Sequence, residues 1–425
     1  MIFTGLLFLG LVALGVPVVV ALALAALLGV AATEGLPLAV VATRTASASD
    51  NFILLAIPLF ALTGSLMSAG GIGRRLFDFA RVLVGHTTSG LAQVNVALSV
   101  FNGGLQGSSA ADAAIDCKVT IPQMRAQGYP AAFSAAVTAV SGMLSNILPP
   151  SIAMLIYASI ANTSVGKLFV AGFVPGLLMA LAMSTVAHLA CLRRGYGRRT
   201  ARASWREIAG AFRQSAFALT LPLIIIGGIR LGYFTPTEAG AVAVIVTFVL
   251  GAFVYRELRM RDLPGILAKT ALDTGVIMMI ISLSSPLSWI LAYHQVPQHV
   301  AAFFVSLGNS VPKFLVATGV FLLIAGCFLE GVTLLILVTP ILAGAAARLG
   351  IDPIHFGMVV IVTVVLGAVT PPFGQLVFFV SSLIDVPPEA IFREVFQFLP
   401  LLLVVLAVIM FVPQSYLWTV RLFGP

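Results

Sequence analysis

The sequence predicts an all-α polytopic membrane protein made of two inverted repeats, each with a re-entrant helical hairpin and a broken transmembrane helix. Three observations support this fold class. First, the 425 residues are 60% hydrophobic and only 9% charged, whereas soluble proteins carry about 25% charged residues. Second, polar interruptions of the apolar sequence occur twice in the same order. Third, the arginines gather in short segments between apolar runs, as the positive-inside rule requires.

Two pairs of polar segments rich in glycine and proline form the duplicated pattern. The first pair is Phe101–Asp112 and Ser145–Ser151, and the second pair is Gly326–Thr333 and Gly367–Gly374. Ser108 precedes Pro149 by 41 positions, and Glu330 precedes Pro371 by 41 positions. Matching interruptions of hydrophobic segments in two halves of a chain indicate the binding site of a secondary transporter.

In the first half, the apolar runs predict spans and one hairpin. We expect a span over 2–32, an interfacial piece over 33–50, a span over 51–70, a hairpin over about 88–125, a broken helix over 130–163 and a span over 168–192. Neither arm of the hairpin has the ~20 apolar residues of a full crossing, so its tip should lie at Gln106–Ser109. Pro149 and Pro150 break the following helix, because proline lacks a backbone donor and clashes with the preceding turn.

The second half repeats this order after two linking spans. We expect spans over 213–231, 236–255 and 263–293, an interfacial piece over 294–311, a hairpin over about 312–347, a broken helix over 353–384 and a last span over 389–420. Glu330 should lie near the tip of the second hairpin. Thr235–Ala239 reads as a capped helix start, with Pro236 in the first turn and Glu238 near the helix N-terminus. The whole chain has room for roughly ten spans.

Arginine-rich segments set the expected topology. Residues 193–212 should form a cytoplasmic basic loop, and Arg256–Arg261 should return to the same side. Counting crossings from these segments brings the first hairpin in from the cytoplasmic side and the second from the opposite side. The domain organisation is therefore a first repeat over 1–192, the loop over 193–212, and a linking helix with the second repeat over 213–425.

The polar interruptions supply the candidate site, because an intramembrane carboxylate is costly and usually functional and hard cations prefer oxygen ligands. The candidates for binding ions or substrate are Asn102, Gly103, Gly104, Gly107, Ser108, Ser109, Asp112, Ser145, Asn146, Pro149, Pro150, Ser151, Glu330, Gly331, Thr333, Gly367, Thr370, Pro371, Pro372, Gly374 and Gln375. Within this set, sodium is expected at Ser108, Ser109, Asp112, Asn146 and Thr370.

Structural alternatives exist for the same residues. Serine and glycine also allow helices to pack closely, Asp112 could cap the second arm of its hairpin, and the proline pairs could be plain kinks. Glu330 could be the partner of an arginine or lie at a wet interface. Asp116 and Lys118 could simply pair with each other or extend toward the interface.

Several function classes lack their motifs. The sequence has no Gly-x-x-x-x-Gly-Lys-Ser/Thr phosphate loop for ATP, no regular arginine series of a voltage sensor and no Thr-Val-Gly-Tyr-Gly potassium filter. No nucleophile with a base and no metal set indicates an enzyme, and Cys117, Cys191 and Cys327 lack metal-ligand spacing. The net charge of +8 fits the positive-inside bias better than nucleic-acid binding. We expect no cofactor apart from sodium as coupling ion.

The motifs together resemble the large membrane subunit of TRAP (tripartite ATP-independent periplasmic) transporters. The resemblance rests on Gly103–Asp112, Ile121–Met124, Gly128-Tyr129, Leu148–Ile152, Pro175-Gly176, Thr235–Ala239 and Thr370–Gly374, and it covers essentially the whole chain. One departure is Ser145–Pro150, where the family usually has a Gly-Pro-Ile-Ile-Pro-Pro-like approach to the first proline pair.

The resemblance implies a sodium-driven importer of organic acids in the bacterial cytoplasmic (inner) membrane. It also implies a periplasmic substrate-binding protein that delivers the substrate, a small four-helix membrane subunit, and an elevator-like movement of the part that carries the hairpins. Dicarboxylates, keto acids and sugar acids would all suit such a site. A stand-alone sodium- or proton-coupled carboxylate carrier and an anion channel remain as alternatives.

Overall fold

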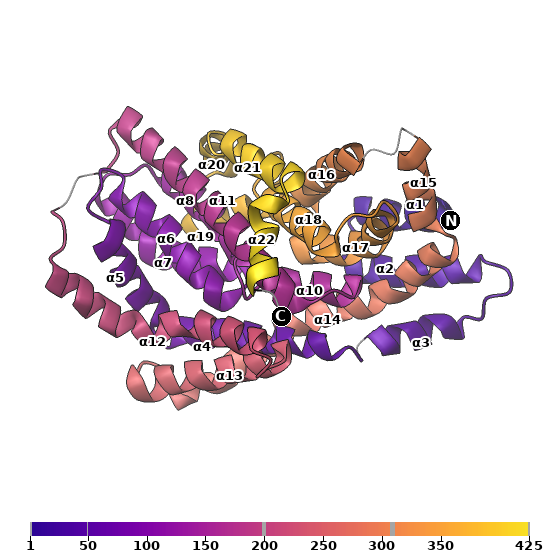
Figure 1. The fold of residues 1–425 in the computed structure, drawn as a ribbon, viewed down its shortest axis with the longest axis horizontal. Helices are drawn as coiled ribbons and strands as arrows, with labels where there is room; N and C mark the ends of the chain where they lie inside the picture. Colours follow the sequence, from indigo (N-terminus) through magenta and orange to yellow (C-terminus); the bar gives the residue numbers. More distant parts are fainter. Residues whose placement is uncertain (1, 49, 198–200, 307–310, 424–425) are drawn as a thin grey trace.

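The computed structural model describes residues 2–48, 50–197, 201–306 and 311–423, and these ranges contain helices joined by short connections (Figure 1). The first half contains α1 (Ile2–Ala13), α2 (Val18–Ala31), α3 (Ala39–Ala48), η1 (Phe52–Leu55), α4 (Ala56–Ala69), α5 (Ile72–Val84), α6 (Gly90–Gln106), α7 (Ser109–Ala126), α8 (Ala131–Gly142), α9 (Leu144–Ile147), α10 (Ile152–Ala161) and α11 (Val165–Arg194). The second half contains α12 (Trp205–Arg230), α13 (Pro236–Val249), η2 (Leu250–Val254), η3 (Met260–Asp262), α14 (Leu263–Tyr293), α15 (Val296–Ser306), α16 (Val311–Phe328), α17 (Gly331–Arg348), α18 (Pro353–Gly367), α19 (Gln375–Ile384), α20 (Pro388–Val395), α21 (Leu399–Phe411) and α22 (Gln414–Phe423).

Both predicted hairpins are present as pairs of helices with tight tips. Helices α6 and α7 form hairpin 1, which turns at Gly107 in the left-handed region with φ of 64°. The Ser108 hydroxyl caps α7 by accepting a hydrogen bond from the Ala111 N–H at 3.4 Å. Helices α16 and α17 form hairpin 2, in which the Glu330 carboxylate caps α17 by accepting from the Thr333 N–H at 2.9 Å. Side-chain oxygens thus satisfy backbone donors that the start of a helix leaves free.

Both predicted broken helices are also present. The first breaks between α9 and α10, and the two parts are bent by 42°. Ser151 caps α10, accepting from the Met154 N–H at 3.3 Å and donating to the Asn146 carbonyl oxygen at 2.6 Å. The second break separates the end of α18 at Gly367 from the start of α19 at Gln375. The breaks coincide with the proline pairs, as the sequence predicts.

The two hairpins point toward each other from opposite ends of the molecule. In Figure 1, α5 and hairpin 1 lie toward the left end, and α15 and hairpin 2 lie toward the right end. Their tips meet at a shared cavity lined by Gly107–Ser109 from one hairpin and Glu330–Thr333 from the other. The prediction of inverted repeats with two hairpins and two broken helices is therefore confirmed.

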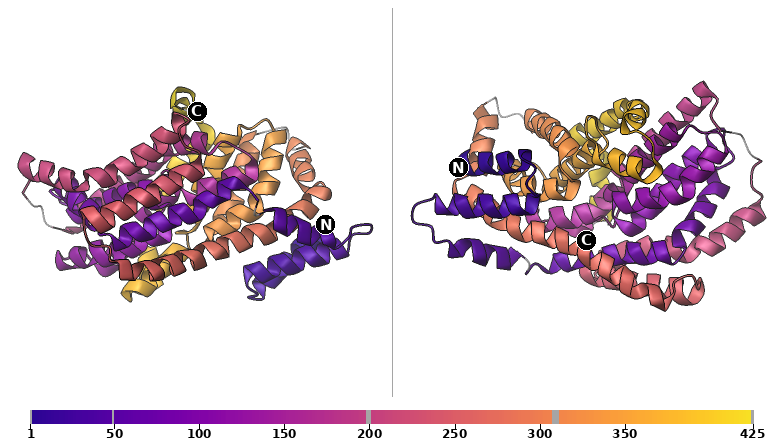
Figure 2. Two further views of the ribbon diagram at one scale, coloured as in Figure 1. Left: turned by 90° about the horizontal axis from the view of Figure 1, so that it is seen from below. Right: turned by 180° about the vertical axis from the view of Figure 1, so that it is seen from behind.

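The helices pack into two groups. The scaffold group comprises α2, α3, α4, α12, α13 and α14, in which α4 packs on α13 and α14 also packs on α2 and α3. The hairpin group comprises α6–α11 and α16–α22. Helix α5 joins the groups by packing on α6 and α12, and α15 does so by packing on α14 and α17. In Figure 1 the scaffold group lies below the hairpin group, and Figure 2 shows the same arrangement from below and from behind.

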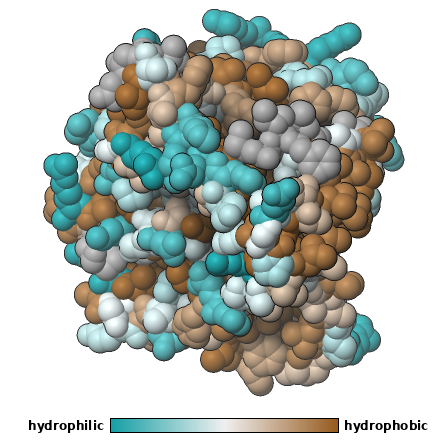
Figure 3. Space-filling view, turned by 90° about the vertical axis from the view of Figure 1, so that its right-hand side faces the viewer, coloured by the Kyte–Doolittle hydropathy of each residue, from teal (hydrophilic) through white to brown (hydrophobic). Residues whose placement is uncertain are grey.

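The composition of the molecular surface fits a protein embedded in a membrane. Seven helices in the described ranges are long and apolar enough to cross a bilayer, or up to nine if each of two bent helix pairs counts as one span. This count is lower than the roughly ten spans expected from the apolar runs. The end of the molecule near α15 carries dispersed hydrophilic residues, with hydrophobic residues along one flank (Figure 3).

Three boundaries differ from the sequence predictions. Residues 2–32 are two packed helices, α1 and α2, because the chain turns back at Gly15 with φ of 80°. A Cβ on Gly29 would lie 2.7 Å from the Thr4 side chain, so the two helices touch. The last predicted span, 389–420, is three helices, with a bend of 57° between α20 and α21. Residues 193–212 include the last turn of α11 and the first turns of α12.

Other local predictions are confirmed or extended. Thr235 caps α13 as expected, because its hydroxyl accepts from the Glu238 N–H at 3.3 Å while the Glu238 carboxylate accepts from the Thr235 N–H at 2.7 Å. Helix α5 has no counterpart among the predicted elements. It buries Leu76 and Phe77 against its neighbours and carries Arg74 on the exposed side. An amphipathic helix of this kind fits the connection between the two groups.

Candidate functional site

A cavity of about 670 Å³ lies where the two hairpin tips, the two broken helices and the scaffold group meet. We call it the central cavity. Its wall is formed by Val18, Val19, Gly107, Ser108, Ser109, Ala110, Asn146, Ile152, Val276, Ile277, Ile280, Glu330, Gly331, Val332, Thr333, Val365, Ala368, Gln375, Leu376 and Phe379. The hairpin group supplies every polar side chain in this wall, and the scaffold group supplies only apolar ones.

Four helix N-termini reach the central cavity. The first residues of α7, α10, α17 and α19 all belong to its wall: Ser109, Ile152, Gly331 and Gln375. Each helix N-terminus carries a partial positive charge and unpaired backbone N–H groups, so it attracts anions. These four N-termini favour an anion in the cavity, whose wall contains neither lysine nor arginine among the described residues and carries the Glu330 carboxylate.

The tip of hairpin 1 is seated directly on the first helix break. A Cβ on Gly107 would lie 2.9 Å from the Pro150 carbonyl oxygen and 3.0 Å from the Ile152 backbone nitrogen. One turn earlier, a Cβ on Gly103 would lie 3.2 Å from the Ser145 Cα. These glycines allow two backbones to approach each other more closely than any other residue would permit.

A buried polar cluster lies beside this seat. Asn102 on α6 donates a hydrogen bond from Nδ2 to Oδ1 of Asp112 on α7, at 2.8 Å. Four further atoms are buried and have no hydrogen-bond partner among the described residues: Asn102 Oδ1, Asp112 Oδ2, Ser109 Oγ and Ser145 Oγ. Asn102, Asp112 and Ser145 are fully buried. Buried polar atoms without partners are costly, and oxygen atoms grouped in this way are the ligands that a hard cation needs.

A second buried carboxylate lies one turn further along α7 and is satisfied within the protein. Asp116 accepts hydrogen bonds from Ser99 at 3.3 Å and from Thr120 at 3.1 Å. Of the two alternatives for this pair of residues, the pairing of Asp116 with Lys118 is not found, because Asp116 is fully buried while Lys118 is exposed. Ser108, and not Asp112, caps the N-terminus of α7. The Asp112 carboxylate is therefore available to bind an ion.

The second break packs against hairpin 2 in the corresponding way. A Cβ on Gly367 would lie 2.9 Å from the Gly326 Cα. Thr370 donates from its hydroxyl to the Leu366 carbonyl oxygen at 2.8 Å, and it is not part of the cavity wall. Glu330 is exposed in the cavity as a helix cap and makes no ion pair with an arginine among the described residues. The second half contributes Gln375 to the cavity wall. Near its helix break it has no buried carboxylate among the described residues that corresponds to Asp112.

The structure brings together only part of the predicted site. The predicted residues that line the central cavity are Gly107, Ser108, Ser109, Asn146, Glu330, Gly331, Thr333 and Gln375. Those placed behind it or in the turns are Asn102, Gly103, Gly104, Asp112, Ser145, Pro149, Pro150, Ser151, Gly367, Thr370, Pro371, Pro372 and Gly374. The predicted set omits the scaffold wall, formed by Val18, Val19, Val276, Ile277 and Ile280. These residues look like any membrane-facing residues, so no sequence pattern marks them.

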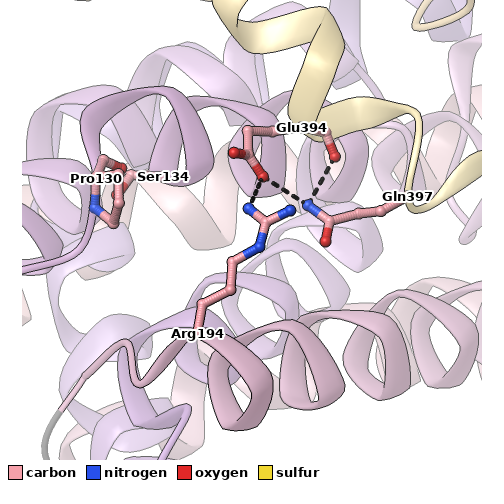
Figure 4. A network of polar contacts seen from close by, with 5 residues as sticks. All are labelled: Pro130, Ser134, Arg194, Glu394 and Gln397. Atoms are coloured by element: carbon pink, nitrogen blue, oxygen red, sulfur yellow. Dashed lines mark hydrogen bonds and ion pairs between the residues drawn. The ribbon is translucent and has the colours of Figure 1, made fainter.

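The two repeats are also joined away from the cavity. At the end of α11, Arg194 donates to the Glu394 carboxylate on α20 at 2.6 Å (Figure 4). Gln397 donates to the same carboxylate at 2.8 Å and to the Glu394 carbonyl oxygen at 2.9 Å. In Figure 4 the three side chains converge between the two helices. This contact holds the ends of the repeats together within the hairpin group.

Inverted repeats, facing hairpin tips and broken helices around a central cavity define the class of secondary transporters. The family model "Tripartite ATP-independent periplasmic transporter, DctM component" matches residues 6–415. The chain therefore belongs to this family, the large permease subunits of TRAP transporters. It is a multi-pass protein of the bacterial inner membrane, and it is a transporter component and not an enzyme.

Individual relatives cover nearly the whole chain. The sialic acid TRAP transporter large permease protein SiaM of Vibrio cholerae is 37% identical over 416 residues, which covers 98% of this chain and 97% of that protein. The C4-dicarboxylate TRAP transporter large permease protein DctM of Pseudomonas aeruginosa is 39% identical over 365 residues, with 86% and 85% covered. The solved structure of the YdaH transporter from Alcanivorax borkumensis has the same fold, with a TM-score of 0.62 at 14% identity over 91% of this chain and 89% of that one.

Proposed function

We propose that this permease subunit imports a small organic acid together with sodium ions. A periplasmic binding protein delivers the acid, a small four-helix membrane subunit accompanies the permease, and an elevator-like movement carries the acid across the membrane. Relatives are named for sialic acid, for C4-dicarboxylates and for 2,3-diketo-L-gulonate, which are all carboxylates. The observation that carries the proposal is the buried polar cluster beside the anion-attracting cavity.

Sodium binding is supported by the chemistry of the buried polar cluster. Asp112 supplies a carboxylate oxygen, and Asn102 and Ser145 supply neutral oxygens that point into the protein without partners. A sodium ion bound there would satisfy these atoms and neutralise the buried carboxylate. An ion in the cluster would also cancel the negative charge behind the tip of hairpin 1, whose Ser108 and Ser109 line the cavity.

The described wall of the central cavity has no cationic side chain that could bind the acid by itself. Binding of the acid should therefore be coupled to binding of sodium. The helix N-termini attract an anion only moderately, by about 0.3–1 kcal/mol each near the surface and up to ~2 when partly buried. A bound sodium ion adds attraction for the organic acid, and the acid in turn stabilises the ion by the same free energy. The two therefore bind and travel together.

The elevator-like movement is supported by the contrast between the two sides of the cavity. The scaffold wall, with residues such as Val18 and Ile277, makes only apolar contacts with whatever lies in the cavity. At this wall of the central cavity, no hydrogen bond has to break when the hairpin group slides along the scaffold group. The polar atoms that hold ion and acid all belong to the hairpin group, so they can move as one unit.

The sodium proposal can be tested without knowing the acid. In the purified permease complex, the thermal unfolding midpoint should rise saturably with sodium chloride and not with potassium chloride, because a ligand that binds only the native state stabilises it. Asp112→Asn should raise the half-saturating sodium concentration by about tenfold or more, a loss of ~1.4 kcal/mol. Thr339→Val is the matched control, since the Thr339 hydroxyl is also buried and unpartnered but lies far along α17. An unchanged sodium response in Asp112→Asn would refute the assignment.

A test of transport itself requires reconstitution with the proposed partners, the periplasmic binding protein and the small membrane subunit. Uptake should need a sodium gradient, should saturate, and should stop when the binding protein is left out. Uptake without the binding protein would indicate a stand-alone carrier. Flux that does not saturate would indicate an anion channel.

A further inference from the structure

A second cavity, of about 240 Å³, adjoins the central cavity between the two groups of helices. We call it the side cavity. Its wall includes Ser68 of α4, Ser108 and Lys118 of hairpin 1, and Lys269, Asp273 and Ile277 of α14. One wall therefore belongs to the hairpin group and the other to the scaffold group.

The two cavities share part of their walls. Ser108, Ile152 and Ile277 line both of them. Ser108 caps α7 at the tip of hairpin 1, so the boundary between the cavities is the tip itself. The side cavity therefore lies directly beyond this tip as seen from the central cavity.

The side cavity has the charged groups that the central cavity lacks. Lys118 projects from α7, and Lys269 and Asp273 project from α14. All three side chains are exposed, and none makes an ion pair or side-chain hydrogen bond within the described ranges of the chain. Two positive charges against one negative charge give this cavity a net positive charge.

The side cavity lies toward the end of the molecule that the positive-inside rule assigns to the cytoplasm. Lys269 follows the basic segment at Arg259 and Arg261 by two turns of helix. Lys118 lies nine residues beyond Ser109 along α7, which is ~14 Å at 1.5 Å per residue. Both lysines are thus on the cytoplasmic side of the hairpin tip.

We propose that Lys118 and Lys269 form a second anion subsite, which receives the carboxylate of the transported acid after it leaves the central cavity for the cytoplasm. The two lysines lie on different groups of helices, so the subsite is complete only in the arrangement seen here. Exposed lysines bind a carboxylate weakly and reversibly. This suits a site that the acid occupies briefly before it is released into the cytoplasm. The direction of travel rests on the proposed function, whereas anion binding by the lysines does not.

The charge of the side cavity can be measured with a cysteine introduced at Ser68, which belongs to the same wall. The measured quantity is the rate at which an anionic methanethiosulfonate modifies the introduced cysteine, divided by the rate for a cationic one. This ratio should be higher in the Ser68→Cys permease complex than in the background in which the same complex also carries Lys118→Gln and Lys269→Gln. The ratio of the two rates should fall by about threefold or more in that background, as expected for removing two unit charges within several ångströms in a wet site. Lys167→Gln is the control, because Lys167 lies on α11 outside the side cavity.

Binding of a carboxylate can be measured on the same introduced cysteine. Succinate should protect this thiol from the anionic reagent better than chloride at equal ionic strength, and the protection should be lost in the double glutamine variant. Lys118→Arg/Lys269→Arg should keep the protection, since arginine keeps the charge. Equal protection by chloride and succinate, or protection that survives the glutamine changes, would overturn the proposal.

A further comparison separates this proposal from the sodium site. The glutamine changes should leave the stabilisation by sodium intact, and Asp112→Asn should leave the ratio of reaction rates at the introduced cysteine intact. If Asp112→Asn retains the sodium response, the proposed coupling fails while the subsite stands. If the lysine changes leave the rate ratio unchanged, the subsite fails while sodium coupling stands.

Discussion

Gly107 at the tip of hairpin 1 lies against the carbonyl oxygen of Pro150, so closely that a Cβ at Gly107 would be 2.9 Å from it. The contact joins the hairpin to the first helix break, next to Ser108, which lines both cavities. It also explains why the tip needs glycine, since the φ of 64° belongs to the left-handed region.

Gly107→Ala should abolish transport while leaving membrane insertion intact. The added methyl group must push the tip away from Pro150, and the left-handed backbone adds a cost of about 1 kcal/mol. Gly128→Ala is the matched control, since Gly128 has φ of 86° and nothing within 4 Å of a Cβ. Uptake rates of the two reconstituted variants, with expression in the membrane as reference, make the comparison. Equal uptake by both variants would show that transport does not depend on the close contact between Gly107 and Pro150.

Gly367→Ala should disturb the second half in the same way. A Cβ there would lie 2.9 Å from the Gly326 Cα, and a backbone atom cannot move aside as a flexible side chain can. We expect a destabilisation of about 1–3 kcal/mol, seen as a lower thermal unfolding midpoint of the purified complex. Gly275→Ala on α14 meets no atom within 4 Å, and it should be neutral or slightly stabilising because alanine favours the helix. A Gly367→Ala protein as stable as wild type would contradict the packing described here.

Ser145→Ala should weaken sodium binding without unfolding the protein. The change removes one unpartnered oxygen of the buried polar cluster and leaves the Asn102–Asp112 hydrogen bond in place. We expect the half-saturating sodium concentration to rise by about three- to tenfold, the loss of one neutral ligand worth ~1 kcal/mol. The control is Thr247→Val on α13, which removes an equally buried, unpartnered hydroxyl in the scaffold group. It should leave the half-saturating sodium concentration unchanged. Titration of the thermal midpoint with sodium gives both values.

Movement between the two groups of helices can be stopped by a cross-link. Asn51, beside the scaffold group, donates to the Ser159 hydroxyl on α10 of the hairpin group at 2.7 Å. A disulfide or short cross-linker between cysteines at these two positions should block uptake until it is reduced. The control pair is Leu59→Cys/Gly240→Cys, which joins α4 to α13 within the scaffold group, where the Cβ atoms would be 3.0 Å apart. Uptake that persists across the Asn51–Ser159 cross-link would rule out sliding at this boundary.

The features that could be predicted from sequence are those in which polar or helix-breaking residues stand out from an apolar background. Gly107 and Ser108 mark a hairpin tip, and the proline pairs mark the breaks, because lipid does not tolerate unsatisfied backbone groups in continuous spans. The equal spacing of these marks in the two halves is enough to predict inverted repeats.

The features that could not be predicted depend on partners that only the fold provides. The turn at Gly15 looks like a mild interruption of a span, and only the contact of Thr4 with Gly29 shows that the chain folds back. The scaffold wall of the central cavity is apolar, so Val276 and Ile277 do not differ in sequence from residues that face lipid. The role of Lys269 depends on its position opposite hairpin 1, which lies about 150 residues away in the chain.

The lack of lysine and arginine in the described wall of the central cavity has a consequence for the order of loading. Without sodium, the full charges in this wall and in the cluster behind it are the carboxylates of Glu330 and Asp112, which repel an incoming acid. An acid that arrives before the ions should therefore leave again, so sodium should bind first and a carrier that holds the acid alone should be rare. Such an arrangement would limit leakage of the acid, which is movement of the acid across the membrane without sodium.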